Sequence, residues 1–313
     1  EACLVGSEMC IRDSSYGIRY DQVELDPTKA ALDAGGMMFK TANEVYSEDY
    51  AGTIVATKRE YDNISGFLRF AKVLSHGEAY LNLSVNERAP DTTELFHAKW
   101  NSSSAMMRHV GNPNLSNERH KTIEVGYEGM FMGSHITGSL FYNDVDDYIT
   151  THRMDDSAMK ARLYKNVDAS LYGYEITAHR VFAGIDTTLN LNYTHADDDT
   201  QNRPLPQIMP LAGDLTFEIK GAKSNYGLRV NFADTQDRFD SKVLDVGRTA
   251  GYTVYDIFAG FEPTPNLRLS IGMANITDKR YATHLNTTNR LDGAADRTDE
   301  PGRTLFGSIN YDF

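Results

Sequence analysis

Residues 303–313, the last of the chain, alternate between apolar and polar side chains. Because the side chains of a strand point alternately to its two faces, one face of this segment is apolar and the other is polar. The apolar face carries Leu305, Ile309, Tyr311 and Phe313, and the polar face carries Thr304, Ser308, Asn310 and Asp312. Such a strand is typical of a membrane β-barrel, which has lipid on one side of its wall and a watery lumen on the other.

The same alternation recurs along the whole chain, and helical periodicity is hard to find. It predicts twelve strands, at 15–25, 62–74, 79–90, 117–129, 134–151, 160–181, 185–199, 210–220, 224–236, 250–262, 266–278 and 303–313. Short turns and long polar loops alternate between these strands, which is the asymmetry of an outer-membrane barrel. Strands of roughly 10 to 20 residues also exceed the usual length in soluble β-sandwiches and propellers. We therefore predict an all-β fold, an antiparallel transmembrane β-barrel segment.

The composition of the 313 residues argues against several classes of protein. No segment approaches the roughly 20 consecutive apolar residues of a transmembrane helix. The formal net charge of -13 argues against nucleic acid as a partner, because binding phosphates needs a basic surface. An acidic lumen would favour cations, although the same charge also serves solubility.

We expect neither catalysis nor a resident cofactor. The sequence contains no HExxH, GxSxG, P-loop or paired CxxC motif. Outer-membrane hydrolases with a serine and a histidine on the barrel wall exist, and Ser139 and His135 are the pair to consider here. We assign these two residues to opposite faces of one strand, which rules out a catalytic contact.

Several motifs resemble those of TonB-dependent outer-membrane receptors. They are Asn86–Asp91 with Glu94–Phe96, Gly111–Leu115 with Glu118 and Glu124, Asn166–Glu175, Gly272–Tyr281, and Glu300–Thr304. Phe313 also looks like the carboxy-terminal assembly signal of bacterial outer-membrane barrels. The resemblance implies a location in the bacterial outer membrane and the import of a scarce ligand.

Receptors of this family have a barrel of about 22 strands closed by an amino-terminal plug domain. Residues 14–313 would then be the C-terminal portion of such a barrel, with the plug absent. The expected partners are outer-membrane lipid and lipopolysaccharide, a small-molecule or metal substrate, and the TonB complex, which acts through the plug. Residues 1–13 resemble a sequencing-adapter artefact, so we expect the chain to be truncated at its amino terminus.

Three stretches look closest to the copper-receptor branch of the family, namely Tyr164–Glu175, Arg203–Leu211 and Thr249–Tyr255. Methionine and histidine also gather in the predicted long loops. Thioether and imidazole ligands suit copper, and thioether particularly suits Cu(I). The barrel-side candidates for binding copper as the transported substrate are Met106, Met107 and His109, followed by Met37 and Met38.

Other interpretations remain open. The methionines could pack inside folded loops instead of binding a metal ion. The ligand could be a ferric siderophore or a cobalamin-type chelate. A passive, porin-like channel of twelve strands is a different class of function, and it would require Ser14–Asp26 to pair with Gly302–Phe313.

Two further sets of charged residues are interpreted as structural. Asp197, Asp198 and Asp199 lack the ligand spacing of a calcium loop, so we expect a solvated acidic rim. Arg19, Arg69 and Arg229 are predicted to point into the lumen and to pair with carboxylates such as Asp21, Glu124 or Asp214.

Overall fold

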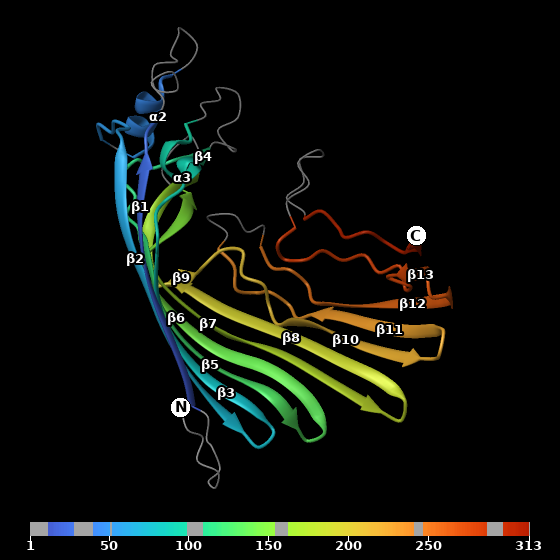
Figure 1. The fold of residues 1–313 in the computed structure, drawn as a ribbon. Helices are drawn as coiled ribbons and strands as arrows, with labels where there is room; N and C mark the ends of the chain where they lie inside the picture. The colour runs from blue at the N-terminus through green and yellow to red at the C-terminus, as the bar shows by residue number, and fades with distance from the viewer. Residues whose placement is uncertain are drawn as a thin grey trace, which may run out of the picture.

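The computed structural model describes residues 12–27, 40–50, 52–98, 109–153, 162–240, 247–286 and 297–312. Most of these residues form one curved antiparallel sheet, in which each strand pairs with the next long strand of the chain (Figure 1). In order along the sheet, the strands are β1 (Arg12–Leu25), β2 (Arg59–Leu74), β3 (Gly77–Arg88), β5 (Glu118–Phe131), β6 (Ser134–Arg153), β7 (Arg162–Phe182), β8 (Ile185–Asp198), β10 (Ala212–Lys220), β11 (Ser224–Ala233), β12 (Tyr252–Thr264), β13 (Leu267–Ala274) and β14 (Thr304–Tyr311).

Each of the twelve predicted strands corresponds to one strand of this path, so the predicted all-β antiparallel fold is confirmed. The long polar stretches between them also contain short elements that the alternation did not predict. These are the helices α2 (Ala42–Asp49) and α3 (Thr92–Phe96), the strand β4 (His109–Val110), which pairs with β7, and the strand β9 (Arg203–Pro204), which pairs with β8.

The sheet does not close on itself within the described residues. β1 pairs only with β2, and β14 pairs only with β13. The pairing of 14–26 with 302–313 that a passive twelve-stranded channel requires is therefore not observed in this part of the chain.

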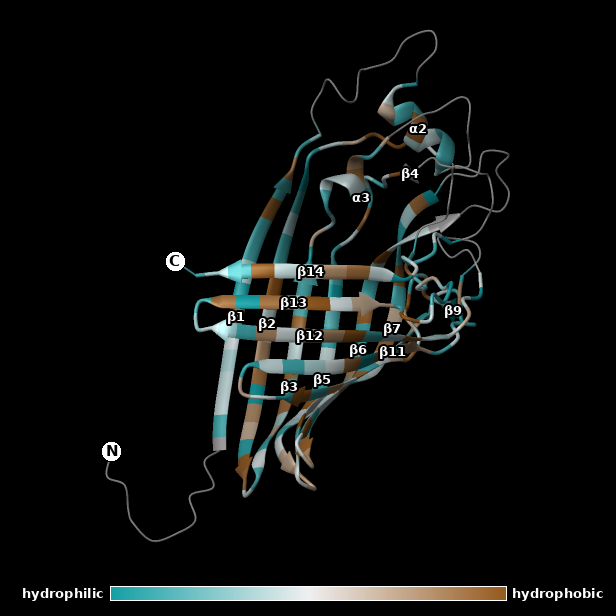
Figure 2. Ribbon diagram, turned by 90° about the vertical axis from the view of Figure 1, so that its right-hand side faces the viewer, coloured by the Kyte–Doolittle hydropathy of each residue, from teal (hydrophilic) through white to brown (hydrophobic). Residues whose placement is uncertain are grey.

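Apolar and polar residues alternate along many of the strands (Figure 2), which places large exposed apolar side chains on one face of the sheet and mainly polar ones on the other. The exposed apolar residues follow the strand period, as in Ile18 (84% exposed), Leu140 (60%) and Ile309 (75%). A continuous apolar surface of this kind is unfavourable in water but favourable in contact with the hydrocarbon of a membrane. We call this the lipid face and the opposite one the lumen face.

The buried apolar side chains lie at the long-loop end of the strands, where the helices gather (Figure 1). Tyr46 of α2, Leu95 of α3, Val110 of β4 and Leu115 are completely buried there. Packing of buried side chains therefore stabilises the loop end. Along the described strands, the apolar side chains would contact lipid instead of forming a packed core.

Tight turns close the opposite end of the strands. Met132–Gly133, between β5 and β6, and Ala183–Gly184, between β7 and β8, have positive φ at both residues (52° and 81°, 51° and 80°). This is the conformation of a type I′ turn, whose twist matches that of the flanking strands and fixes their register.

On the lumen face, aromatic rings lie flat against glycines of the neighbouring strand. Five glycines face an aromatic residue directly across the ladder, and a Cβ atom at each would overlap or crowd the ring. The pairs are Gly17 with Phe67, Gly126 with Tyr80, Gly173 with Phe141, Gly227 with Phe258, and Gly272 with Phe306.

Candidate functional site at the loop end

Helix α3 begins at a capping box made by Asp91 and Glu94. The Asp91 carboxylate accepts hydrogen bonds from the backbone amides of Thr93 and Glu94, both at 2.7 Å. The Glu94 carboxylate accepts one from the Asp91 amide, also at 2.7 Å. These reciprocal bonds satisfy amides that a helix start leaves unpaired, so a single turn of helix is stable here.

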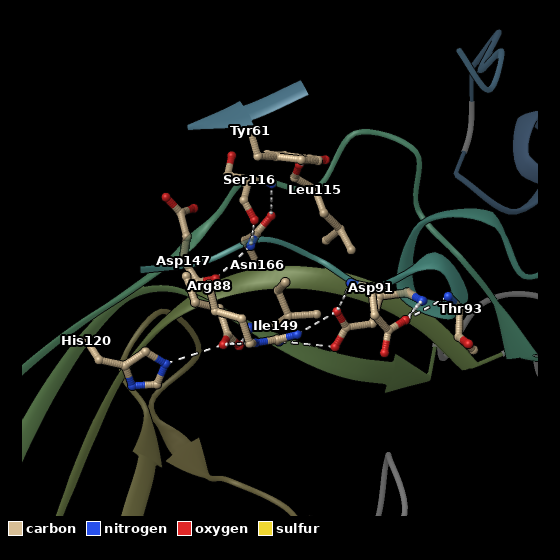
Figure 3. Close-up of polar contacts among 12 residues, drawn as sticks. Tyr61, Arg88, Asp91, Thr93, Leu115, Ser116, His120, Asp147, Ile149 and Asn166 are labelled. Carbon is tan, nitrogen blue, oxygen red and sulfur yellow. Dashed lines mark hydrogen bonds and ion pairs between the residues drawn. The ribbon is translucent and has the colours of Figure 1, made fainter. Parts of the chain in front are cut away.

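Glu118, the first residue of β5, is the centre of a polar network beside α3 (Figure 3). Its carboxylate accepts hydrogen bonds from Nε of Arg88 at 2.7 Å and from the backbone amide of Ile149 at 2.6 Å. The Nε2 atom of His120 lies 3.3 Å from the same carboxylate. Arg88 also binds both oxygens of Glu94, at 2.9 and 3.1 Å. The network thus joins β3, α3, β5 and β6.

The Glu118 network lies outside the lipid-facing part of the wall. Along β5, the outward residues Ile123 and Val125 are exposed and apolar, whereas Lys121 and Arg119 are charged. Lys121 forms ion pairs with Asp144 (3.2 Å) and Asp146 (2.7 Å) of β6. The lipid band therefore ends between Ile123 and Lys121, below Glu118.

The carboxyl of Glu118 stays ionised although it is buried. Burial alone would raise its pKa, but hydrogen bonds from His120, Arg88 and the Ile149 amide together lower the pKa to about 2. A charge with so many donors is fixed in position, because moving it would leave a buried carboxylate unpaired.

The Gly111–Leu115 motif ties the end of the preceding loop to β7. The amide of Gly111 donates to the His97 carbonyl at 2.6 Å, and the side chain of Asn112 donates to the Tyr164 carbonyl at 3.1 Å. A Cβ atom at position 111 would lie 2.7 Å from the backbone of Leu95, so only glycine fits.

Asn166 of β7 also binds the backbone next to this motif (Figure 3). Its side chain accepts from the Ser116 amide at 2.9 Å and donates to the Asp147 carbonyl at 2.6 Å. The motif residues are therefore anchors that hold the loop base on the wall.

Helix α2 packs on the same loop base. Tyr46 and Val45 of α2 form a buried cluster with Val110 of β4 and Leu163 of β7. The hydroxyl of Tyr46 donates to the Phe96 carbonyl at 2.7 Å, and burial raises its pKa to about 12.

The Tyr50 hydroxyl, which follows α2, lies 2.9 Å from the Val110 carbonyl. It lies 3.1 Å from the carbonyl of Tyr164 and accepts a hydrogen bond from the Tyr164 amide at 3.0 Å. Burial also raises the pKa of Tyr50, so its hydroxyl remains protonated. This residue joins α2, β4 and β7.

Four of the five predicted copper ligands cannot be placed. Met37, Met38, Met106 and Met107 lie outside the described residues. The backbone of His109 begins β4, opposite Arg162, while its side chain is not described. The described structure therefore leaves these residues as predicted ligands.

The acidic run 197–199 is not one site. Asp197 faces His195 (3.0 Å) and Arg238, Asp198 is buried against Arg203 (3.2 Å), and Asp199 accepts from Ser170 (3.2 Å). Protein partners hold Asp197 and Asp198, contrary to the expected solvated rim, whereas Asp199 is exposed to solvent. Among the described residues, no three His, Cys, Asp or Glu side chains form a group that could hold a metal ion.

The predicted lumen arginines have partly different partners. Arg19 pairs with Asp21 at 2.6 Å, as predicted. Arg69 pairs with Glu78 at 3.4 Å, and Glu124 accepts from Tyr80 instead. Arg229 donates to Thr216 at 3.3 Å, and Thr216 donates to Asp214.

The assignment of Ser139 and His135 to opposite faces is wrong. Four residues apart on one strand, they share the lumen face, where Ser139 is opposite Glu175 and His135 is opposite His179. Separate register positions keep them from forming a serine–histidine pair.

Residues 13–276 match the family described as TonB dependent receptor-like, beta-barrel. The chain belongs to this family. TonB-dependent receptors are outer-membrane proteins of Gram-negative bacteria and are not enzymes. Membership of the family therefore confirms the predicted location and the predicted lack of catalytic activity. No helix in the described ranges is long and apolar enough to cross a membrane.

Solved structures with the same fold include "Copper transporter OprC", with a TM-score of 0.81, 23% sequence identity, and coverage of 97% of this chain and 45% of that one. The siderophore receptor PirA from Acinetobacter baumannii gives a TM-score of 0.65 at 13% identity, covering 98% and 53%. The ferric enterobactin receptor PfeA (mutant G324V) from Pseudomonas aeruginosa gives 0.62 at 15% identity, covering 98% and 52%. The TonB-dependent receptor chain thus spans about half the length of these structures.

Proposed function

We propose that the receptor containing this chain imports copper across the outer membrane. The observation that carries the proposal is that the described segments nearest in sequence to the two predicted methionine pairs pack against each other. Lys40, two residues after Met38, leads into α2, and His109, two residues after Met107, begins β4. Because α2 and β4 share one buried cluster, the described segments that follow the two pairs in the sequence lie in the same small region at the loop end.

The chemistry of these residues supports copper over harder cations. Two methionine pairs and His109 supply thioether and imidazole groups, which favour Cu(I) and also bind Cu(II). The fold comparison also supports copper, because the fold of this chain is more similar to that of the copper transporter (TM-score 0.81) than to those of the siderophore receptors (TM-scores 0.61 to 0.65).

In this proposal, the loops capture the ion and the energised TonB complex drives its release inward through a plug domain. Lipid and lipopolysaccharide would surround the lipid face. The second candidate substrate is a ferric siderophore, because receptors for such ligands share the fold.

Isothermal titration of the purified receptor with Cu(I) and Cu(II) tests the proposal. We expect tight copper binding that weakens at least 10-fold in a Met106→Leu/Met107→Leu variant and in a Met37→Leu/Met38→Leu variant. Met273→Leu is the matched control, because Met273 lies on the lipid face opposite Leu305. A receptor that binds ferric siderophore but no copper would overturn the proposed copper import. Equal copper binding by all three variants would show that the four loop methionines are not the ligands.

A further inference from the structure

Three residues with metal-binding side chains form a row across β5, β6 and β7 at the turn end of the sheet. Met130 is directly opposite His135, and His135 is directly opposite His179. The type I′ turn at Met132–Gly133 fixes the first of these pairings. The row lies at the opposite end of the strands from α2 and β4.

The row belongs to the lumen face. On β6, Leu140 and Tyr142 are exposed on the lipid face, and His135 has the opposite parity. Directly opposite residues of adjacent strands point to the same side, so Met130 and His179 share the face of His135. Met130 is 48% exposed, His135 is exposed, and the His179 side chain is 44% exposed, so the row is open to a ligand.

The spacing suits chelation of one ion. Cβ atoms of directly opposite residues are about 4.5–5.5 Å apart, so two imidazoles can converge on an ion at the usual nitrogen–metal distance of about 2.0–2.1 Å. The thioether of Met130 is one strand further along the same row. Two imidazoles with a thioether are a ligand set that suits copper better than magnesium or calcium.

A carboxylate already orients one of the imidazoles. Nε2 of His179 lies 2.6 Å from Oδ1 of Asp186 on β8, and the other oxygen of Asp186 accepts from Lys220 at 2.7 Å. A histidine that holds a carboxylate through one ring nitrogen presents the other nitrogen to a metal ion.

The same rim also has ordinary ion pairs, one of which shares Asp186 with His179. Lys220 pairs with Asp186 and with Glu218, and Arg268 pairs with Glu262 at 2.7 Å. Within the described part of the chain, His135 has no hydrogen-bond or ion-pair partner. Asp186 accounts for the position of His179, but neither charge pairing nor burial accounts for the exposed Met130 and His135 beside it.

We propose that Met130, His135 and His179 form a second, weaker copper site on the lumen wall at the turn end. The identity of the ion rests on the proposed copper import, whereas the site itself rests on the row. An ion that leaves the loop-end ligands would meet this site before it leaves the lumen. A weak, exposed site suits such a step, because an ion in transit must also be released.

Copper titration of the purified receptor, with a chromophoric Cu(I) chelator as competitor, tests the proposal. We expect wild type to bind a weaker equivalent in addition to the loop-end one, and His135→Ala/His179→Ala to lose only the weaker one. The matched control is Thr137→Ala/Thr177→Ala, the next lumen-facing pair directly opposite on the same two strands, which should keep it. Loss of the weaker equivalent in both double variants, or in neither, would overturn the proposal.

Spectroscopy and single substitutions test the contributions of the histidines and of Met130 separately. Electron paramagnetic resonance of the weaker Cu(II) site should show nitrogen coordination that disappears in His135→Ala, a substitution at an exposed residue that leaves folding intact. Met130→Leu should weaken Cu(I) about 10-fold and leave Cu(II) nearly unchanged, and an unaltered Cu(I) affinity would remove the thioether from the site. If copper import itself is wrong, the tight equivalent and uptake vanish, while the weaker equivalent and its dependence on the histidines persist.

Discussion

Replacing Glu118 by glutamine should destabilise the loop end by about 3 kcal/mol at neutral pH. The substitution keeps the shape of the side chain but removes its charge, and it places an amide group opposite the donors of Arg88 and His120. The pKa of Glu118 falls from 4.5 to about 2 on folding, and one pKa unit corresponds to about 1.36 kcal/mol, which gives the magnitude. The Glu118 side chain is only 5% exposed, so solvent screens this interaction little.

The pH dependence of stability distinguishes this charge from a general packing effect. Because the folded pKa is depressed, the stabilisation is fully present above about pH 4.5 and is lost as the pH falls through about 2. Wild type should therefore lose stability between pH 4.5 and pH 2, and Glu118→Gln should not lose this increment.

Guanidinium denaturation of the receptor in lipid vesicles, followed by circular dichroism, measures the difference. Glu60→Gln is the control, because Glu60 makes an exposed ion pair with Lys58 that is worth little. Equal stability of Glu118→Gln and Glu60→Gln at pH 7 would refute the reasoning. So would a gap between wild type and Glu118→Gln that stays unchanged at pH 2.

Two other substitutions test the wall and the loop base. Gly227→Ala should destabilise the receptor by about 1–3 kcal/mol in the same denaturation assay, because the new methyl group overlaps the Phe258 ring, and Phe258→Ala added to it should recover part of the loss. Tyr50→Phe should cost about 1–3 kcal/mol locally, because it leaves the Tyr164 amide without the hydroxyl as acceptor. Hydrogen exchange at Tyr164 should then accelerate while exchange within β10–β11 stays unchanged, and equal rates at Tyr164 would contradict the role of the hydroxyl.

The strands could be predicted because the alternation that lipid imposes is local. Leu305, Ile309 and Tyr311 were assigned to one face from parity alone, and all three are exposed on the lipid face. The same reasoning fails within the loops, where packing decides. Helix α3 lies in a stretch interpreted as polar loop, although its Asp91–Glu94 capping box is legible in the sequence.

Side-chain contacts between neighbouring strands could not be predicted from the sequence, because they depend on the register of the strand pairing. The sequence offers Glu124 among the carboxylates for the lumen arginines, but Arg69 pairs with Glu78 and Tyr80 donates to Glu124. The row of Met130, His135 and His179 was missed for the same reason. Met130 and His135 flank one turn, but His179 is far away in the sequence, and only the ladder β6–β7 places it beside His135.

The two ends of the wall differ in a way that fits directed transport. At the loop end, Glu118, Asn166 and Tyr50 use several hydrogen bonds each to hold the loop base, so ligands that extend from it start from fixed points. At the turn end, His135 and Met130 are exposed, so an ion bound there exchanges readily. In the proposed copper import, an ion would pass from a tight site at the loop end to a weaker site at the turn end, and this transfer needs energy supplied at the first site. That is the step at which a TonB-driven plug would act, and it predicts that blocking TonB stops uptake while leaving both copper equivalents bound.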